Sequence, residues 1–309
     1  AQLFSRRLYV SATYFRSKRD GIITSMTGNL PLYWGLRNVA VYENHNASLQ
    51  QGVEAAFRFG GRTGDFGYSV GASFAFRKSK YLRYDESYTY AYQAVKGTAL
   101  DAYRGYVYLG KFASAEEIAS SPEQTFDEKL QPGDLKYADL NNDGRIDSND
   151  QCVIGHTDPR FIYAVNLHLS YKWFDLTVVG TGRAGYQVPF TNAWFWNGWG
   201  DNNYSKFVKK NFGGDYPRIA YNKVNNNFQQ SAYWLRDGGF FKIQNVELGF
   251  DAPIPAGSRT GIKGLRIFLR GANLLTISRI KDVDPESVDS GVSTYPLFRT
   301  FTAGINLTF

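Results

Sequence analysis

One segment of this 309-residue chain carries oxygen-bearing side chains at the spacing of a metal site. It reads DLNNDGRIDSND and runs from residue 139 to residue 150. Positions 1, 3, 5, 9 and 12 hold oxygen side chains and position 7 offers a backbone carbonyl, so the candidate ligands are Asp139, Asn141, Asp143, Arg145, Asp147 and Asp150. Gly144 at position 6 permits the sharp turn of an EF-hand-type loop, and Ca²⁺ prefers several converging oxygens. The spacing predicts a structural calcium site.

Position 12 of this segment is Asp rather than the usual Glu, so the flanking helices of a true EF-hand need not be present. The alternative interpretation is an Asx-rich turn that binds no ion, because Asp and Asn side chains bond readily to nearby backbone N–H groups.

A second segment, from residue 187 to residue 227, combines many aromatic residues with Asn and Gly. Flat rings beside amides are suited to binding sugar rings and also peptides. We therefore predict contacts with substrate or with a partner protein for Trp194, Trp196, Trp199, Tyr204 and Tyr216. The alternative is that these rings pack the core of their own loop.

No group of residues predicts catalysis. His45, His156 and His168 are scattered, without a nucleophile or a metal-ligand spacing beside them. The basic residues behind the net charge of +7 are spread along the chain rather than clustered, which argues against nucleic-acid binding. Cys152 is the only cysteine, so no intrachain disulfide can form. We expect a protein without enzymatic activity.

The elements that position these segments follow from an alternating pattern. At the end of the chain every second residue is apolar, namely Phe301, Ala303, Ile305, Leu307 and Phe309. Side chains alternate across a strand, so a strand between lipid and an aqueous lumen shows this period. The pattern recurs at 53–59, 66–76 and 161–171. It predicts that lipid contacts Val70, Phe74, Val165, Leu167, Ile305 and Leu307.

The fold class expected from this pattern is all-β, a transmembrane antiparallel β-barrel. Eight strands are predicted, at about 4–18, 40–60, 66–80, 160–172, 174–184, 239–250, 264–276 and 297–309. A β-bulge is expected at Gln244 and Asn245, where the apolar phase slips by one residue. Tight turns alternate with long connections, which should be extracellular loops, at about 19–39, 81–159, 185–238 and 277–296.

Eight strands alone enclose only enough space for side chains, and the long connections are too large for so small a barrel. The chain also begins close to a strand and shows no signal peptide. We therefore expect residues 1–309 to be the C-terminal part of one larger barrel domain.

Several short motifs in order resemble the SusC-like branch of the TonB-dependent outer-membrane transporters. Before the acidic segment these are residues 105–112 (GYVYLGKF) and 132–139 (PGDLKYAD). After it come 154–155 (IG), 158–161 (DPRF), 171–176 (YKWFDL), 233–238 (YWLRDG), 242–246 (KIQNV), 271–276 (GANLLT) and 295–301 (YPLFRTF). The resemblance covers about residues 38 to 309.

This resemblance implies a barrel of about 22 strands with an N-terminal plug that is not in this chain. It also implies a place in the outer membrane of a Gram-negative bacterium, a SusD-like lipoprotein as partner, and energy from the TonB complex through the missing N-terminal region. The implied function is uptake of oligosaccharides or oligopeptides, and the residues do not distinguish these substrates. An outer-membrane hydrolase or protease and a passive porin are the alternatives.

Overall fold

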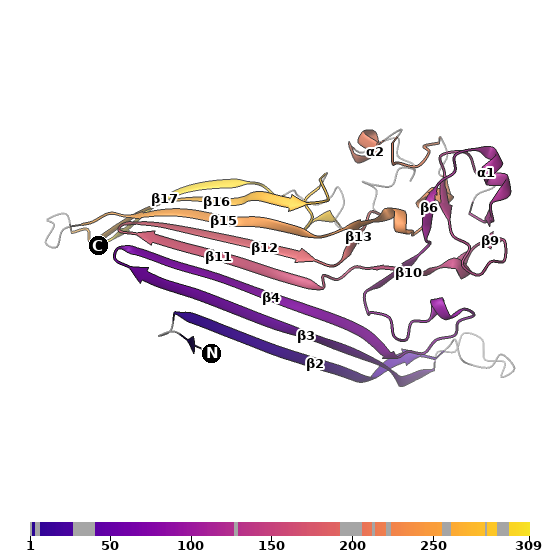
Figure 1. Ribbon diagram of the computed structural model, residues 1–309, viewed down its shortest axis with the longest axis horizontal. Coiled ribbons are helices and arrows are strands. Elements are labelled where there is room, and N and C mark those ends of the chain that lie inside the picture. The colour runs from indigo at the N-terminus through magenta and orange to yellow at the C-terminus, as the bar shows by residue number, and fades with distance from the viewer. Residues whose placement is uncertain are drawn as a thin grey trace.

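The strands of the chain form one long antiparallel sheet (Figure 1). The computed structural model describes residues 2–3, 7–26, 41–126, 129–191, 206–211, 214–220, 224–254, 261–281, 283–288 and 297–309. Within these residues the sheet order is β1-β2-β3-β4-β11-β12-β15-β16-β17. The strands are β1 (Gln2–Leu3), β2 (Leu8–Ser25), β3 (Tyr42–Thr63), β4 (Phe66–Arg83), β11 (Phe161–Tyr171), β12 (Phe174–Ala184), β15 (Phe240–Asp251), β16 (Gly264–Ser278) and β17 (Thr300–Thr308).

All eight strands predicted from alternation are present, which confirms the all-β fold class. The first three are longer than predicted, and β2 continues through Asp20 and Gly21 to Ser25. The loop expected from residue 19 therefore begins later. The pattern missed this extension because the pairing of β2 with β3 shifts register between Arg19 and Ile22, which breaks the alternation while backbone hydrogen bonding goes on.

One side of the sheet is apolar across its whole width. The strand register places Leu169 opposite Leu176, Leu176 opposite Leu248, and Leu248 opposite Leu269. Leu248 and Leu269 are 48% and 58% exposed. An apolar surface of this extent would be an aggregation hazard in water, whereas it is the expected outer surface of a membrane barrel.

The opposite side of the sheet is polar and carries ion pairs. Arg266 on β16 lies 2.6 Å from Asp175, 3.1 Å from Glu247 and 3.0 Å from Asp251. Arg270 is paired with Glu247 at 2.5 Å. Charges paired in this way are suited to the wall of a water-filled lumen.

The bulge predicted at Gln244 and Asn245 is confirmed. The pairing of β15 shifts between Ile243 and Asn245 against β16, and between Val179 and Gly180 on the side of β12. The extra residue shifts the alternation of side chains in the second half of β15 by one position. Phe241, Ile243, Val246 and Leu248 therefore lie on the same apolar side although their numbers differ in parity.

The long connections gather at one end of the sheet and the tight turns at the other (Figure 1). The turn between β3 and β4 has Gly64 at φ 60°, and the turn between β11 and β12 has Lys172 at φ 52°. The helices α1 (Ala115–Ser120) and α2 (Lys206–Asn211) lie in the long connections. No helix among the described residues is long and apolar enough to cross a membrane.

The long connections also contain short strands that pair with one another. They are β5 (Ala102–Gly105), β6 (Tyr108–Lys111), β7 (Glu123–Gln124), β8 (Leu135–Tyr137), β9 (Arg145–Ile146), β10 (Cys152–His156), β13 (Gln187–Pro189) and β14 (Leu235–Asp237). The pairs are β5 with β10, β6 with β8, β7 with β9 and β13 with β14. The connections are therefore folded structures with their own secondary structure.

We predict that an arginine at Val165 destabilises the sheet in the membrane by about 2–4 kcal/mol, because the charge would lie in lipid. The matched control is Asn166→Arg, one residue along β11 on the polar side. Spin labels at Val70, Phe74, Val165, Leu167, Ile305 and Leu307 should be accessible to oxygen and protected from a water-soluble relaxant. Water accessibility at most of these six positions would show that the two sides have been exchanged.

Candidate functional site

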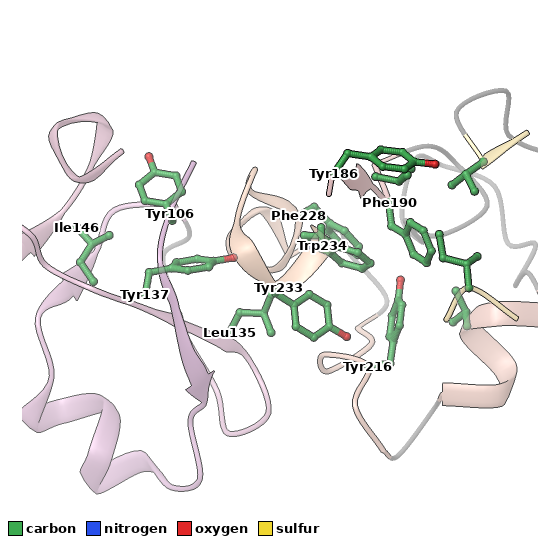
Figure 2. Packing of buried hydrophobic residues seen from close by; sticks show 14 residues of the cluster. Tyr106, Leu135, Tyr137, Ile146, Tyr186, Phe190, Tyr216, Phe228, Tyr233 and Trp234 are labelled. Atoms are coloured by element: carbon green, nitrogen blue, oxygen red, sulfur yellow. The ribbon is translucent and has the colours of Figure 1, made fainter. Parts of the chain in front are cut away.

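Two long connections fold together into a loop platform, defined here as the described residues of 84–159 and 185–238. Its core is a cluster of buried aromatic and aliphatic side chains that come from both connections (Figure 2). Trp234 is 1% exposed and meets Tyr233 edge to face, with ring centroids 4.8 Å apart. Tyr106 and Tyr137 bring the first connection into the cluster. Burial raises the pKa values of Tyr137 and Tyr233, so both phenols stay neutral.

Below the rings, a buried polar network joins the two connections. Asp134, which is fully buried, accepts two hydrogen bonds from Arg218, at 3.0 and 3.2 Å. The amide nitrogen of Asn227 donates to the same carboxylate at 2.9 Å, and its oxygen accepts from the backbone N–H of Leu135 at 2.8 Å. Asn226 donates to the carbonyl of Leu135 at 2.8 Å. Buried polar groups with such complete partners favour one relative placement of the two segments.

The platform is attached to the sheet through the connection between β16 and β17. Lys242 on β15 is 1% exposed and is paired with Asp284 at 3.0 Å and with Glu286 at 2.5 Å. Ile280 and Val288 from the same connection join the buried cluster. This connection therefore contacts both the polar side of the sheet and the platform.

A cavity of about 550 Å³ lies between the polar side of the sheet and this connection. Its lining includes Thr13, Glu54, Ser73, Thr181, Arg183 and Glu286. Hydroxyl groups and charges of both signs make the wall suitable for a polar solute, and the volume is in the range of ligand sites. This cavity is the candidate substrate site, and its residues come from strands far apart in the sequence.

Of the five aromatic residues predicted to contact substrate or a partner, the structure describes Tyr216. Tyr216 is 3% exposed and its ring lies 5.8 Å from that of Trp234, so it packs the platform core, as in the alternative interpretation. Trp194, Trp196, Trp199 and Tyr204 lie outside the described residues, and their contact with substrate or partner stays a prediction.

The acidic segment forms a tight turn stabilised by its own carboxylates. Asp139 accepts hydrogen bonds from the backbone N–H groups of Asn142 and Gly144, at 2.7 and 2.9 Å. Asp143 accepts from Arg145 N–H at 2.8 Å, and Asn141 accepts from Asp143 N–H at 3.1 Å. Gly144 has φ 83°, which glycine adopts without strain. The backbone therefore has the sharp turn that an EF-hand-type loop needs.

The end of the acidic segment faces inward. Asp150 is fully buried and accepts from the N–H groups of Leu140 and Asp147, at 2.8 and 2.9 Å. Tyr92 donates to the carbonyl of Asn149 at 2.8 Å. Burial raises the pKa of Tyr92, and the negative charge of Asp150 raises it further. The segment thus joins residues around Tyr92 to the rest of the platform.

The acidic segment fits a calcium ion only in part. In this conformation no group of three or more His, Cys, Asp or Glu side chains among the described residues is placed to hold a metal ion. Each carboxylate has about four lone-pair positions, however, so an N–H bond leaves others for a cation. The side chain of Arg145 lies 3.5 Å from Glu123, which leaves its backbone carbonyl as the predicted ligand.

The three histidines lie on separate strands, so they do not form a common site. His45 is on β3, and His168 on β11 bonds to Thr177 at 3.0 Å. Burial lowers the pKa of His156 on β10, and the neighbouring Arg160 lowers it further.

Asp101 is paired with Arg160 at 3.0 Å. Burial would raise the pKa of Asp101, but hydrogen bonds and the charge of Arg160 lower it overall.

The sequence pattern does not predict the polar network that joins the two connections of the platform. Asp134 follows Pro132 and Gly133 in an apparent turn, and Asn226 and Asn227 lie in a run of three asparagines. Such residues usually mark exposed loops. Their burial depends on partners about 90 positions away, so no local signal could have identified them.

We predict that Arg218→Met disorders the junction between the two connections, because it leaves the Asp134 carboxylate buried without its cation. The loss of a buried partner typically costs about 3–5 kcal/mol. Hydrogen exchange in detergent should be faster at β8 and at residues 224–228. The control is Arg77→Met, which removes an exposed pair with Asp158 worth about 0–1 kcal/mol. Equal exchange in the two variants would contradict the role of the network.

Comparison with known proteins finds relatives that match the whole length of the chain. No protein-family model matches it. It is 26% identical to TonB-dependent receptor P26 of Formosa agariphila, over 100% of this chain and 33% of that receptor. It is 25% identical to TonB-dependent receptor SusC of Bacteroides thetaiotaomicron, over 60% of this chain and 19% of the receptor. The chain thus spans at most about a third of the length of these relatives.

The fold of the chain is also similar to that of solved structures. A structure of the RagAB peptide importer superposes on 100% of this chain and 33% of its own, with a TM-score of 0.71 and 18% sequence identity. A second RagAB structure, in the closed-closed state, gives a TM-score of 0.70. The likeness to these receptors, together with a sheet that has one apolar and one polar side, fits a SusC-like TonB-dependent receptor of the bacterial outer membrane.

Proposed function

We propose that the chain forms part of an active importer of oligomeric nutrients, either oligosaccharides or oligopeptides. The observation that carries this proposal is the cavity of about 550 Å³ against the inner wall of the sheet, bordered by Glu286, whose lining combines hydroxyl groups and charges with apolar residues such as Ile162 and Phe240. A solute that enters from outside would pass the platform and reach a wall of hydroxyl groups and charges. Among the structural neighbours RagAB is described as a peptide importer, which supports transport of an oligomer.

The proposal includes two partners. A SusD-like lipoprotein would cover the outer face of the platform, where Tyr88 and Leu109 are 51% and 58% exposed. An exposed tyrosine ring such as that of Tyr88 is a common anchor at protein interfaces. The TonB complex would supply energy through a region outside this chain, as the name of the relative SusC supports.

We predict that a second, lipid-anchored protein copurifies with the intact receptor in mild detergent. Alanine at Trp194, Trp196 and Trp199 should weaken this association or reduce the uptake of labelled oligosaccharides or oligopeptides by cells. Loss of TonB should abolish uptake. Trp173→Ala, in the tight turn between β11 and β12, is the control because its ring is exposed at the end of the sheet away from the platform. A receptor that purifies alone, with uptake unchanged by the triple substitution, would refute the predicted contacts.

We also propose that the acidic segment binds calcium with a structural role. Four carboxylates stand within its twelve residues, and the turn at Gly144 has the required shape. An ion held by Asp139, Asn141 and Asp143, with Asp147, Asp150 and the Arg145 carbonyl, would fix the segment against Tyr90 and Tyr92. Outside the cell a Kd of about 10⁻⁴ to 10⁻³ M is sufficient, as in other extracellular calcium modules.

The calcium proposal can be tested with terbium, which occupies calcium sites and emits when a nearby tyrosine is excited. Tyr90 lies within hydrogen-bond distance of Asn141, so it should sensitise an ion in the segment. We expect emission that calcium displaces and that Asp139→Asn with Asp143→Asn removes. Asp158→Asn, an exposed carboxylate elsewhere on the chain, should leave the emission unchanged. Emission equal in all three proteins would leave only the Asx-turn interpretation.

A further inference from the structure

A second cavity, of about 430 Å³, lies at the flank of the platform between α2, β14 and the residues that follow β16. Its floor is apolar, because Phe190, Tyr233 and Ile280 line it and are at most 7% exposed. Its rim is charged and is formed by Lys210, Asp215, Arg236, Asp237, Arg279 and Lys281. The cavity is separate from the one against the inner wall of the sheet, since the two share none of their lining residues.

Arg236 is held rigidly inside this cavity. Its guanidinium lies 5.3 Å from the ring centroid of Tyr233 and 5.8 Å from that of Phe190. Its Nη1 atom donates to the backbone carbonyls of Tyr233 and Leu235. Within the described residues it forms no ion pair with a carboxylate. A planar guanidinium fixed in this way is well suited to donate two parallel hydrogen bonds to an anion.

The cations of the rim differ in their partners. Arg279 is 3.3 Å from Asp237, whereas Arg236 and Lys281 have no carboxylate partner among the described residues. Two cations outside this cavity each have several carboxylate partners. Lys242 has two carboxylate partners and Arg266 has three.

We propose that this cavity binds an anionic group, a carboxylate or a sulfate ester, carried by the transported oligomer. This inference rests on the proposed import function and adds the chemical class of the substrate. The volume is in the range of small-ligand sites, whereas protein partners usually dock on flatter surfaces. The aromatic floor would contact the body of the bound unit while Arg236, Arg279 and Lys281 contact the anion.

The test is binding to the intact receptor purified in detergent with its partner proteins. The probes are hexagalacturonate, its fully methyl-esterified neutral form, hexaglutamate and hexaglutamine. At least one anionic probe should bind about tenfold or more tightly than its neutral counterpart, because hydrogen bonds to charged groups contribute about 1.5–3 kcal/mol. The preference should fall as salt rises, since exposed charges are screened. Whether the sugar or the peptide is preferred distinguishes the two sources of the anion.

Three variants assign the preference to this cavity. Arg236→Gln and the double variant Arg279→Gln with Lys281→Gln should each remove it, whereas Lys96→Gln, an exposed cation elsewhere on the platform, should not. The double variant changes only exposed side chains and so keeps the test valid if Arg236→Gln fails to fold. Equal binding of anionic and neutral probes, or a preference that survives the double variant, overturns the inference. Uptake of the neutral probes by cells would still support import, so the two proposals fail separately.

Discussion

Every backbone polar group that lies in lipid must be hydrogen-bonded within the protein, and the rest of this structure follows from that constraint. A continuous antiparallel sheet satisfies it, because each strand of the sheet from β3 to β16 is paired on both sides. The constraint also explains the bulge at Asn245. The ladder shifts register there and then continues, so the two halves of β15 keep their apolar side chains on one side.

Outside the membrane the constraint is weaker, and the connections have a different kind of core. The platform buries aromatic rings, but it also buries Asp134, Asn226 and Asn227, each with less than 1% exposure. These polar groups are stable inside because side chains and backbone groups from the other connection satisfy them. Apolar packing alone would allow several placements of the two connections, whereas directional hydrogen bonds select one.

The two cavities lie where these two kinds of structure meet. The cavity against the sheet has a wall of strand residues and is closed on one side by the connection that Lys242 anchors. The cavity beside Arg236 lies within the platform and is bounded by the same connection.

The alternation of side chains in the sequence determined the sheet. The period of two is a property of each strand by itself. It can be read from Phe66 to Phe76 or from Phe301 to Phe309 without knowing which strand pairs with which. The bulge was readable for the same reason, because a change of phase is local. The contents of the connections were not readable in this way. Tyr216 became a core residue because Trp234 lies beside it, and Asp134 could be buried because Arg218 reaches it. Both outcomes depend on contacts between residues far apart in the chain, and only the tertiary structure brings such residues together.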